Sequence, residues 1–233
     1  MRRFVADTET ATMKGPIIDL ALIEIDEHLE VLRSYECLID PLVPIAPAAQ
    51  AVNGISQAMV ADAPTMAEMI ARDGMPFPMD EPFTIICHNA QFDCRMLAAE
   101  GLLPTNYKRI CSLKMARALW PELDPERENH KLGTLALMFG LETGVAHRAM
   151  GDTVTLLNLL RHMADTTEFG SLDELLELGT REISQDSKLN FGLKHKDTKI
   201  KDVPKQYIDW MFKSVTDLDP DLRIALEVRY QKP

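Results

Sequence analysis

The sequence lacks the features that mark membrane, secreted and disordered proteins. No apolar run approaches the roughly 20 residues that a membrane-spanning helix needs. A secretory signal needs an apolar run near the N-terminus, but acids stand at positions 7 and 9. Hydrophobic residues make up 46% and charged residues 26% of the chain, values that are ordinary for a globular protein and argue against disorder. We therefore expect a cytoplasmic protein that does not bind membranes.

Cysteine is scarce as well, and its pattern argues against two kinds of stabilising site. The cysteines form no C-x-x-C pair and lie mostly in apolar surroundings; they are Cys37, Cys87, Cys94 and Cys111. A zinc site and a disulfide framework are therefore disfavoured, and we expect reduced thiols in the core.

An excess of basic residues is also missing. The formal net charge is −11, which argues against a broad basic face that binds nucleic acid. Lysines gather in one stretch only, and they are Lys188, Lys194, Lys196, Lys199, Lys201 and Lys205. An electrostatic footprint for DNA is expected in that stretch, although an ordinary solvated surface explains the lysines equally well.

Short apolar runs separated by turn-rich breaks predict the elements of an α/β fold. Strands are expected at 3–8, 17–25, 31–39, 83–87 and around 109–111. Helices are expected after a capping box at 65–68, and at 91–100, 113–119, 132–139 and 151–164. The first three strands resemble a meander, and the whole order predicts a mixed sheet flanked by helices.

The last part of the chain is expected to form a separate small module. A second capping box, Ser171-Leu-Asp-Glu174, opens a short leucine-rich helix that we place at the junction. Further helices are predicted near 204–213 and from position 219 onward. We therefore predict a larger domain at 1–168 and a small C-terminal module at 169–233.

Two acids at the end of the first strand are the first candidates for chemistry. Asp7 and Glu9 are two residues apart, so their side chains leave the same face of a strand. Two like charges this close repel, and the arrangement makes most sense with a cation between them. The alternative is a strand end that carries two solvated acids.

Two further fragments place acids at the starts of predicted helices. Asp93 lies one turn into the helix that follows the strand at 83–87, where α/β sheets usually build sites. His147 stands five residues before Asp152, and since five helical residues span roughly 140°, we expect the histidine on the preceding loop. Alternatively, the acids favour the helix dipole and the histidine is an ordinary surface residue.

Together these fragments resemble the DnaQ-like 3′-to-5′ exonuclease family of the DEDDh type, whose motifs read D-x-E, N-x-x-F-D and H-x-x-x-x-D. The three motifs occur here in order, as Asp7 to Glu9, Asn89 to Asp93 and His147 to Asp152. Chance agreement of five reactive residues in suitable contexts is improbable. The resemblance implies a ribonuclease-H-like fold.

The resemblance extends along nearly the whole chain toward one branch of that family, the exodeoxyribonuclease X type. Supporting segments are 53–56, 59–62, 111–117 and 119–121, and in the tail 191–192, 203–204, Tyr207, Trp210 and 220–223. Two positions depart from the pattern. Asn53 stands where many members have histidine, and Asp197 stands where a glycine is expected.

The resemblance implies hydrolysis of phosphodiester bonds at DNA 3′ ends, with release of nucleoside 5′-monophosphates. Because the phosphate is anionic, we expect two Mg²⁺ or Mn²⁺ ions to neutralise the site. Asp7, Glu9 and Asp152 are assigned to the first ion, and Asp7 with Asp93 to the second. His147 is the expected general base, since an imidazole accepts protons near neutral pH.

Substrate contacts are expected around the same motifs. The motif residues are Thr8, Thr10, Asn89 and Phe92. In the turn after the first strand, Met13 is expected to stack on the terminal base and Lys14 to meet a phosphate, which would block the continuing strand. An equally simple alternative is that Met13 belongs to the core and that Lys14 is solvated. The expected partner is a single-stranded or frayed DNA 3′ end, and protein partners are not predicted.

Three other functions compete with this one. The same five residues also suit a proofreading subunit of a replicative polymerase or an RNA-trimming enzyme, because the sequence does not reveal how a 2′-hydroxyl is treated. A catalytically silent nucleic-acid-binding module is disfavoured, because such a scaffold has no use for all five reactive groups.

Overall fold

The computed structural model describes residues 1–123, 130–180, 185–189, 194–215, 218 and 220–231. The chain divides into two compact units, Met1–Thr180 and Arg181–Pro233, which are described separately below. Among the described residues, no helix combines the length and the apolar character needed to cross a bilayer.

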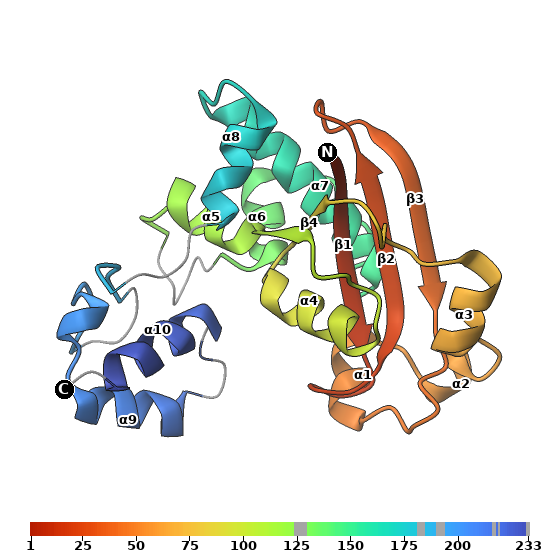
Figure 1. The fold of residues 1–233 in the computed structure, drawn as a ribbon, viewed down its shortest axis with the longest axis horizontal. Helices are drawn as coiled ribbons and strands as arrows, with labels where there is room; N and C mark the ends of the chain where they lie inside the picture. The colour runs from red at the N-terminus through yellow and green to blue at the C-terminus, as the bar shows by residue number, and fades with distance from the viewer. Residues whose placement is uncertain (124–129, 181–184, 190–193, 216–217, 219, 232–233) are drawn as a thin grey trace. The chain divides into compact units, whose positions relative to one another are not determined.

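A mixed sheet of five strands forms the centre of the first unit (Figure 1). The strands are β1 (Arg2–Thr10), β2 (Ile17–Ile25), β3 (Val31–Leu38), β4 (Phe83–Cys87) and β5 (Tyr107–Cys111), in the spatial order β3-β2-β1-β4-β5. β1, β2 and β3 form the expected antiparallel meander, whereas β4 pairs in parallel with both β1 and β5. The predicted mixed sheet flanked by helices is confirmed.

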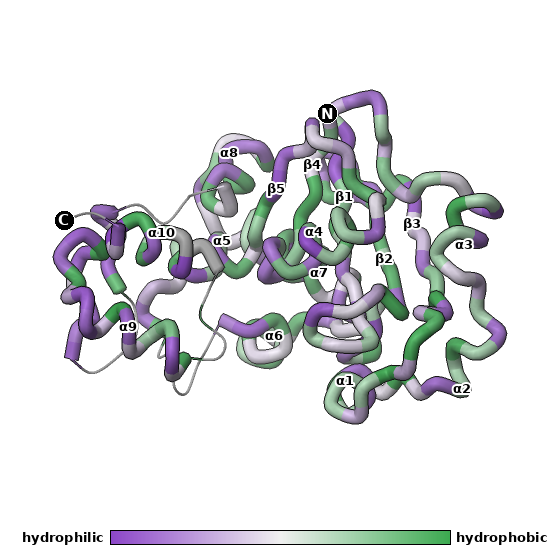
Figure 2. Tube along the Cα trace, turned by 60° about the horizontal axis from the view of Figure 1, so that its bottom comes forward, coloured by the Kyte–Doolittle hydropathy of each residue, from purple (hydrophilic) through white to green (hydrophobic). Residues whose placement is uncertain are grey.

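Both faces of the sheet are covered, which explains why two of its strands are buried along their whole length. Every residue of β2 and of β4 is buried, and Figure 2 shows both strands as largely hydrophobic. Along β1, Phe4 and Ala6 pack into one hydrophobic cluster while Val5 packs into another. This alternation follows from the two-residue period of a strand and separates the two faces of the core.

Helices from different parts of the chain cover the two faces. They are α1 (Pro47–Asn53), α2 (Gln57–Val60), α3 (Met66–Asp73), α4 (Ala90–Ala99), α5 (Ser112–Leu119), α6 (Leu132–Phe139), α7 (Ala149–Thr166) and α8 (Leu172–Glu177). α3 and α4 supply Met69, Cys94, Met96 and Leu97 to the cluster that contains Phe4. The opposite face is covered by α5 to α8. The capping box predicted at Thr65 is present at the start of α3.

The first unit extends further along the chain than the sequence predicts. α8 contributes Leu175 and Leu176 to the cluster around Ile110, so it packs on the sheet unit. The Ser171 hydroxyl accepts from the Glu174 N–H at 3.3 Å. In a full capping box the Glu174 carboxylate would accept from the Ser171 N–H. Here it accepts from the Gly170 N–H at 2.9 Å. The predicted boundary at 168/169 therefore falls inside the first unit, because the buried leucines of α8 need the larger core.

The second unit is a small helical body. It contains a 3₁₀ turn at Ile200–Asp202, α9 (Lys205–Ser214) and α10 (Pro220–Gln231), close to the helices predicted for the tail. Its core consists of Leu189, Ile200, Val203, Ile208, Met211, Leu218, Leu222, Ala225 and Leu226. Asp197 adopts a φ of 66°, the left-handed region that favours glycine. The segment 191–192, which carries part of the family resemblance, lies outside the described residues.

Candidate active site

Asp7 and Glu9 lie at the carboxyl end of β1, where the sheet becomes narrower. β4 pairs with β1 only as far as Val5, so the last residues of β1 have a strand neighbour on one side only, β2. The parallel strands β1 and β4 end at the same edge of the sheet, and the loop after β4 leads into α4. The end of the short strand therefore leaves room beside Asp7 and Glu9 for residues from helices.

Asp93 fills this position from the first turn of α4. Its Oδ1 atom accepts hydrogen bonds from the Thr8 N–H at 3.1 Å and from the Thr8 hydroxyl at 2.9 Å. The Thr8 N–H is a strand donor that β4 is too short to pair with. Asn89, with a φ of 70°, makes the turn from β4 into the helix. Asp93 thus ties α4 to the middle of the D-x-E motif.

His147 and Asp152 reach the same site from the start of α7. One ligand atom from each of Glu9, His147 and Asp152 lies within 4.8 Å of the other two. The His147 N–H donates to the Asp152 carboxylate at 3.1 Å, and His147 has a φ of 59°. The histidine therefore precedes α7, as expected, and its exposed side chain stands beside the acids.

Burial and mutual repulsion raise the pKa values of the clustered acids. Burial, with the charge of Asp152, raises the pKa of Glu9 to about 8. Burial raises the pKa of Asp93 to about 7, although the hydrogen bonds from Thr8 act to lower it. The pKa of Asp7 lies well above its usual range, first through burial and then through the charge of Asp93. Positive charge is therefore needed before all these groups ionise together.

The donor set fits a divalent cation of the hard, oxygen-binding kind. Carboxylate oxygens are the ligands preferred by Mg²⁺ and Mn²⁺, and the convergent donors include oxygens of Glu9 and Asp152. The charges of Asp93 and Asp152 raise the pKa values of both Asp7 and Glu9, because the carboxylates lie close together. A bound cation would replace this repulsion with attraction.

An ion pair that was not predicted from the sequence anchors the loop that carries His147. Asp19, on β2 opposite Glu9, is buried, and its Oδ2 atom accepts from Arg148 Nε at 2.9 Å and from the Ala149 N–H at 3.3 Å. Arg148 follows His147 directly, so this pair fixes the start of α7 on the sheet. The signal in the sequence was an acid inside an otherwise apolar strand, 17–25.

Close backbone contact holds the same loop from the other side. A side chain at Gly151 would bring its Cβ within 1.9 Å of the Val145 carbonyl oxygen, which no Cβ tolerates. Gly144 likewise lies against the Gly151 backbone. Both glycines are therefore required for the backbone of the loop that carries His147 to pack closely against α7.

Asn53, one of the two departures from the family pattern, supports Glu9. Its side chain forms a hydrogen bond with Glu9 that acts to lower the pKa of that acid. Its Nδ2 atom donates to the Thr10 carbonyl at 3.4 Å, while its Oδ1 accepts from the Ile55 N–H at 3.0 Å. The amide thus links the end of α1 to the end of β1.

The other predicted substrate-binding residues differ in how accessible they are. Thr8 is buried and engaged by Asp93, and the Thr10 hydroxyl donates to the Thr12 carbonyl at 2.7 Å. Asn89 is exposed and Phe92 is half-buried. In the turn after β1, Met13 is 80% exposed and Lys14 is also exposed, so the alternative that Met13 belongs to the core is wrong.

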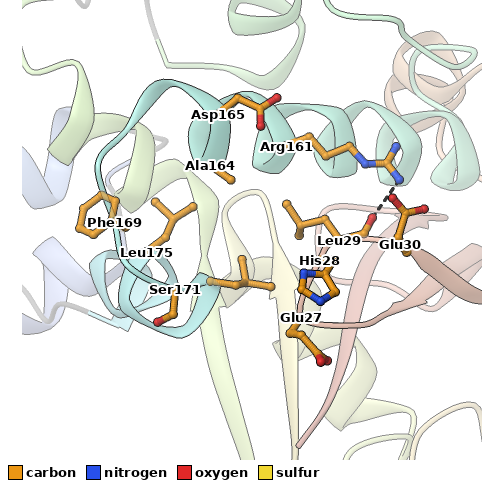
Figure 3. A pocket seen from close by; sticks show the side chains of 11 residues that line it. Glu27, His28, Leu29, Glu30, Arg161, Ala164, Asp165, Phe169, Ser171 and Leu175 are labelled. Carbon is orange, nitrogen blue, oxygen red and sulfur yellow. Dashed lines mark hydrogen bonds between the residues drawn. The ribbon is translucent and has the colours of Figure 1, made fainter.

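A pocket of about 360 Å³ lies at the other end of α7 and does not contain the acid cluster (Figure 3). Its lining includes Leu29, Arg161, Asp165 and Phe169. The Arg161 guanidinium donates to the Leu29 carbonyl at 2.8 Å, which Figure 3 draws as a dashed line. Nine helical residues separate Asp152 from Arg161, roughly 13 Å along the axis, so the pocket is distinct from the candidate active site.

Comparison with known proteins agrees with this site. The family model described as "Exonuclease" matches residues 4–160, and the chain therefore belongs to the exonuclease family, in its DnaQ-like DEDDh type, and is a nuclease. It is 28% identical to Exodeoxyribonuclease 10 of Escherichia coli (strain K12), over 96% of both chains. It is 31% identical to the DNA polymerase III subunit epsilon of Treponema pallidum (strain Nichols), covering 67% of this chain and 74% of that protein.

Solved structures show the same fold. A structure described as "Exonuclease X in complex with 5′ overhanging duplex DNA" has a TM-score of 0.59 and 26% identity, covering 76% of this chain and 99% of the other. The nuclease domain of 3′hExo, a DEDDh family member bound to rAMP, has a TM-score of 0.56 at 17% identity, covering 73% of this chain and 95% of the other. The expected ribonuclease-H-like fold is confirmed.

Proposed function

We propose that this chain removes nucleotides from the 3′ ends of DNA by hydrolysing phosphodiester bonds, with release of nucleoside 5′-monophosphates. The observation that carries the proposal is the meeting of Glu9, His147 and Asp152, with donor atoms within 4.8 Å of one another, beside the half-buried Asp7 and the buried Asp93. These groups come from β1, α4 and the start of α7, far apart in the sequence. A scaffold without chemistry has no need to gather them.

The acids divide the work of holding cations. Asp7, Glu9 and Asp152 are proposed to bind one Mg²⁺ or Mn²⁺ ion, and Asp7 together with Asp93 a second. When bound, the two cations supply positive charge to the phosphate and to the departing 3′ oxygen. Thr8 keeps Asp93 in place through its two hydrogen bonds, and Asn53 does the same for Glu9.

His147 is proposed to act as the general base. Its exposed ring lies beside Glu9 and Asp152, where an attacking water must lose a proton. The N–H bond to Asp152 and the Arg148–Asp19 ion pair hold the loop, so that the ring needs little reorganisation during the reaction.

DNA is the proposed substrate because a relative that aligns over 96% of both chains is named Exodeoxyribonuclease 10. The similar structure at 26% identity contains a duplex with a 5′ overhang. Exposed Met13 is proposed to contact the terminal base, and exposed Lys14 a phosphate. Asn89 and Phe92 of the second motif are proposed as further substrate contacts. Thr8 and Thr10 are proposed to shape the end of β1. A role in DNA repair, a cytoplasmic location and a C-terminal module of the exodeoxyribonuclease X type belong to the same proposal.

Two variants test the assignment of roles on a labelled single strand, with and without EDTA. Asp7→Asn is expected to lose both turnover and Mn²⁺ binding measured by calorimetry. His147→Ala is expected to lose roughly 10²- to 10⁴-fold in turnover while it still binds Mn²⁺ and DNA. His28→Ala, which changes an exposed histidine away from the site, serves as the matched control. Wild-type turnover in His147→Ala would rule out the proposed base.

A proofreading exonuclease is the second candidate, favoured by the 31% identity to the DNA polymerase III subunit epsilon. Proofreading predicts faster removal of a mismatched than a matched 3′ terminus. Digestion of paired and mispaired primers, and of DNA and RNA strands of one sequence, separates this candidate and an RNA-trimming activity from the main proposal. Equal rates at both termini with a DNA preference support the main proposal.

A further inference from the structure

The second unit carries a row of three neighbouring rings, of which the first pair is tilted at 57° and the second pair is stacked. His195 lies beside Tyr207 with ring centroids 4.5 Å apart, and Tyr207 stacks on Trp210 with centroids 5.1 Å apart and planes at 25°. We call these three residues the ring ladder. Trp210 ends the ladder and is 47% exposed. A ring that is already held by its neighbour loses little conformational freedom when another flat ring stacks on it.

The ladder follows from the amphipathic character of α9. Ile208 and Met211 are fully buried in the core of the unit, which orients the helix. Tyr207 and Trp210 are three residues apart and are therefore neighbours on the helix surface. Lys213, exposed at the next position of this spacing, continues the row. Tyr207 is only partly buried against the core of the unit, and Trp210 lies at the surface.

Exposed lysines flank the ladder. Lys194 and Lys196 adjoin His195 in the sequence, and both are exposed. Lys199 and Lys201 differ from them, because they form ion pairs with Asp186 at 3.3 and 2.6 Å. Positive charge thus lies at both ends of the ladder, in a chain whose formal net charge is −11.

The nearest acid on α9 is engaged elsewhere. Asp209 lies between Tyr207 and Trp210 in the sequence, and its carboxylate accepts a hydrogen bond from the Tyr230 hydroxyl, an interaction that raises the pKa of Tyr230. Asp197, within the lysine segment, is exposed and remains a local negative charge. The lysines around the ladder outnumber these acids.

We propose that the ring ladder and Lys194, Lys196 and Lys213 form a second binding site, which holds single-stranded DNA. Single-strand sites combine aromatic platforms for bases with cations for the phosphates, and both parts are present here. A single strand fits because its base faces are free to stack on Trp210, whereas those of a duplex are already stacked. This inference rests on the proposed function for its choice of DNA as the strand.

The site has a specific consequence for the enzyme. A strand held at two places dissociates more slowly, because binding at the second place becomes intramolecular. Strands long enough to reach the ladder should therefore gain affinity, while the chemical step at the 3′ end is unchanged. The structure assigns the ladder to substrate retention and leaves turnover to the first unit.

Binding of oligothymidylates to the full chain in EDTA tests the site without catalysis. Strands of roughly 4 and roughly 20 nucleotides bracket the usual size of a single-strand site. Trp210→Ala is expected to weaken binding of the longer strand roughly tenfold, whereas Trp210→Phe keeps a stacking ring and restores most of it. Val228→Ala, at another exposed apolar residue of the same unit, is the matched control and should bind as wild type.

Salt dependence tests the lysines. Replacing Lys194 and Lys196 by glutamine should reduce the slope of log affinity against log salt by about 1.4, since each single-strand phosphate contact contributes about 0.7. In a variant with Trp120→Phe, Trp210 is the remaining tryptophan, and its fluorescence should fall when the strand stacks on it. Unchanged binding of the longer strand by Trp210→Ala, or an equal loss for a blunt duplex, overturns the inference.

The two proposals can fail separately. A chain that binds the long strand through Trp210 but digests no DNA would retain this inference and lose the proposed function. A chain that digests DNA while Trp210→Ala has the wild-type KM on long strands would retain the proposed function and lose the second site. In steady-state digestion, the expected result for Trp210→Ala is a raised KM on long strands with kcat unchanged.

Discussion

In the first unit the charge is negative and gathered at the edge of a sheet, whereas in the second unit the exposed charge around the ring ladder is positive. Under the proposed function, the difference reflects two needs of a nuclease that uses cations. Acids must converge where the cations bind, and the field that results repels the phosphates of the substrate. Lysines placed on a separate unit can attract the strand without neutralising the acids. This contrast predicts opposite responses of the two units to charge, cations and salt.

The largest expected effect is the pH dependence of the cation-free protein. The pKa of Glu9 rises from an ordinary value of 4.5 to about 8. In the unfolded chain this carboxyl loses its proton near 4.5, but in the folded chain it keeps the proton to about 8. Stability is therefore lost as the pH rises between these values. Thermal unfolding in EDTA should show a melting temperature on the order of 5 °C lower at the upper end of this window.

Cations and charge removal should reverse that loss. Saturating Mn²⁺ should raise the melting temperature more at pH 8 than at pH 5, because ionised carboxylates bind it. Asp7→Asn should melt at a higher temperature than wild type in EDTA at pH 8, although it is inactive. Asp62→Asn, which removes an exposed acid away from the site, should melt at the wild-type temperature in EDTA and keep the wild-type response to Mn²⁺. A melting temperature that rises with pH in EDTA would contradict the assigned repulsion.

The next effect concerns the anchor of the histidine loop. Asp19→Asn breaks the ion pair with Arg148 and should lower kcat by roughly tenfold through a less well placed His147. In a His147→Ala background the same change should have little further effect on kcat, because the base it positions is gone. Steady-state kinetics of the two single variants and the double variant measure this coupling.

The control for this anchor is Asp173→Asn, which breaks a different ion pair with Arg3 at 2.8 Å, away from the acid cluster. It should leave kcat unchanged. If the effects of Asp19→Asn and His147→Ala on kcat simply add, the ion pair acts on the fold in general and not through the histidine.

The smallest expected effect lies in the second unit. Asp197 holds a left-handed φ of 66°, which glycine adopts without a steric penalty. Asp197→Gly should therefore stabilise that unit slightly, by about 0.5 kcal/mol, since the flexibility gained by the unfolded chain offsets part of the relief. Chemical denaturation monitored by Trp210 fluorescence in a Trp120→Phe background measures it. Lys196→Gly, at a neighbour with ordinary backbone angles, should destabilise instead.

Local patterns in the sequence were enough to predict most strands and helices. β4 was predicted at 83–87 and found at Phe83–Cys87, because a fully apolar run between breaks has few other uses. The capping box at Thr65 was visible because both of its hydrogen bonds are local. α1 and α2 were missed, since they are short and α1 begins at Pro47 without a polar cap. The boundary at 168/169 was misplaced because burial of the α8 leucines depends on the distant β5.

For the site, the motif spacings alone predict which residues are chemically able to act, because they place Asp7 with Glu9 on one strand face and put His147 before a helix. That these groups meet depends on the folded chain, since β4 ends early enough for Asp93 to reach Thr8. The tertiary structure also decided the roles of Asp19 and Asn53, whose partners are distant in the chain. Repulsion and burial act through space, so the pKa values of the acids, and their need for a cation, follow from the folded chain alone.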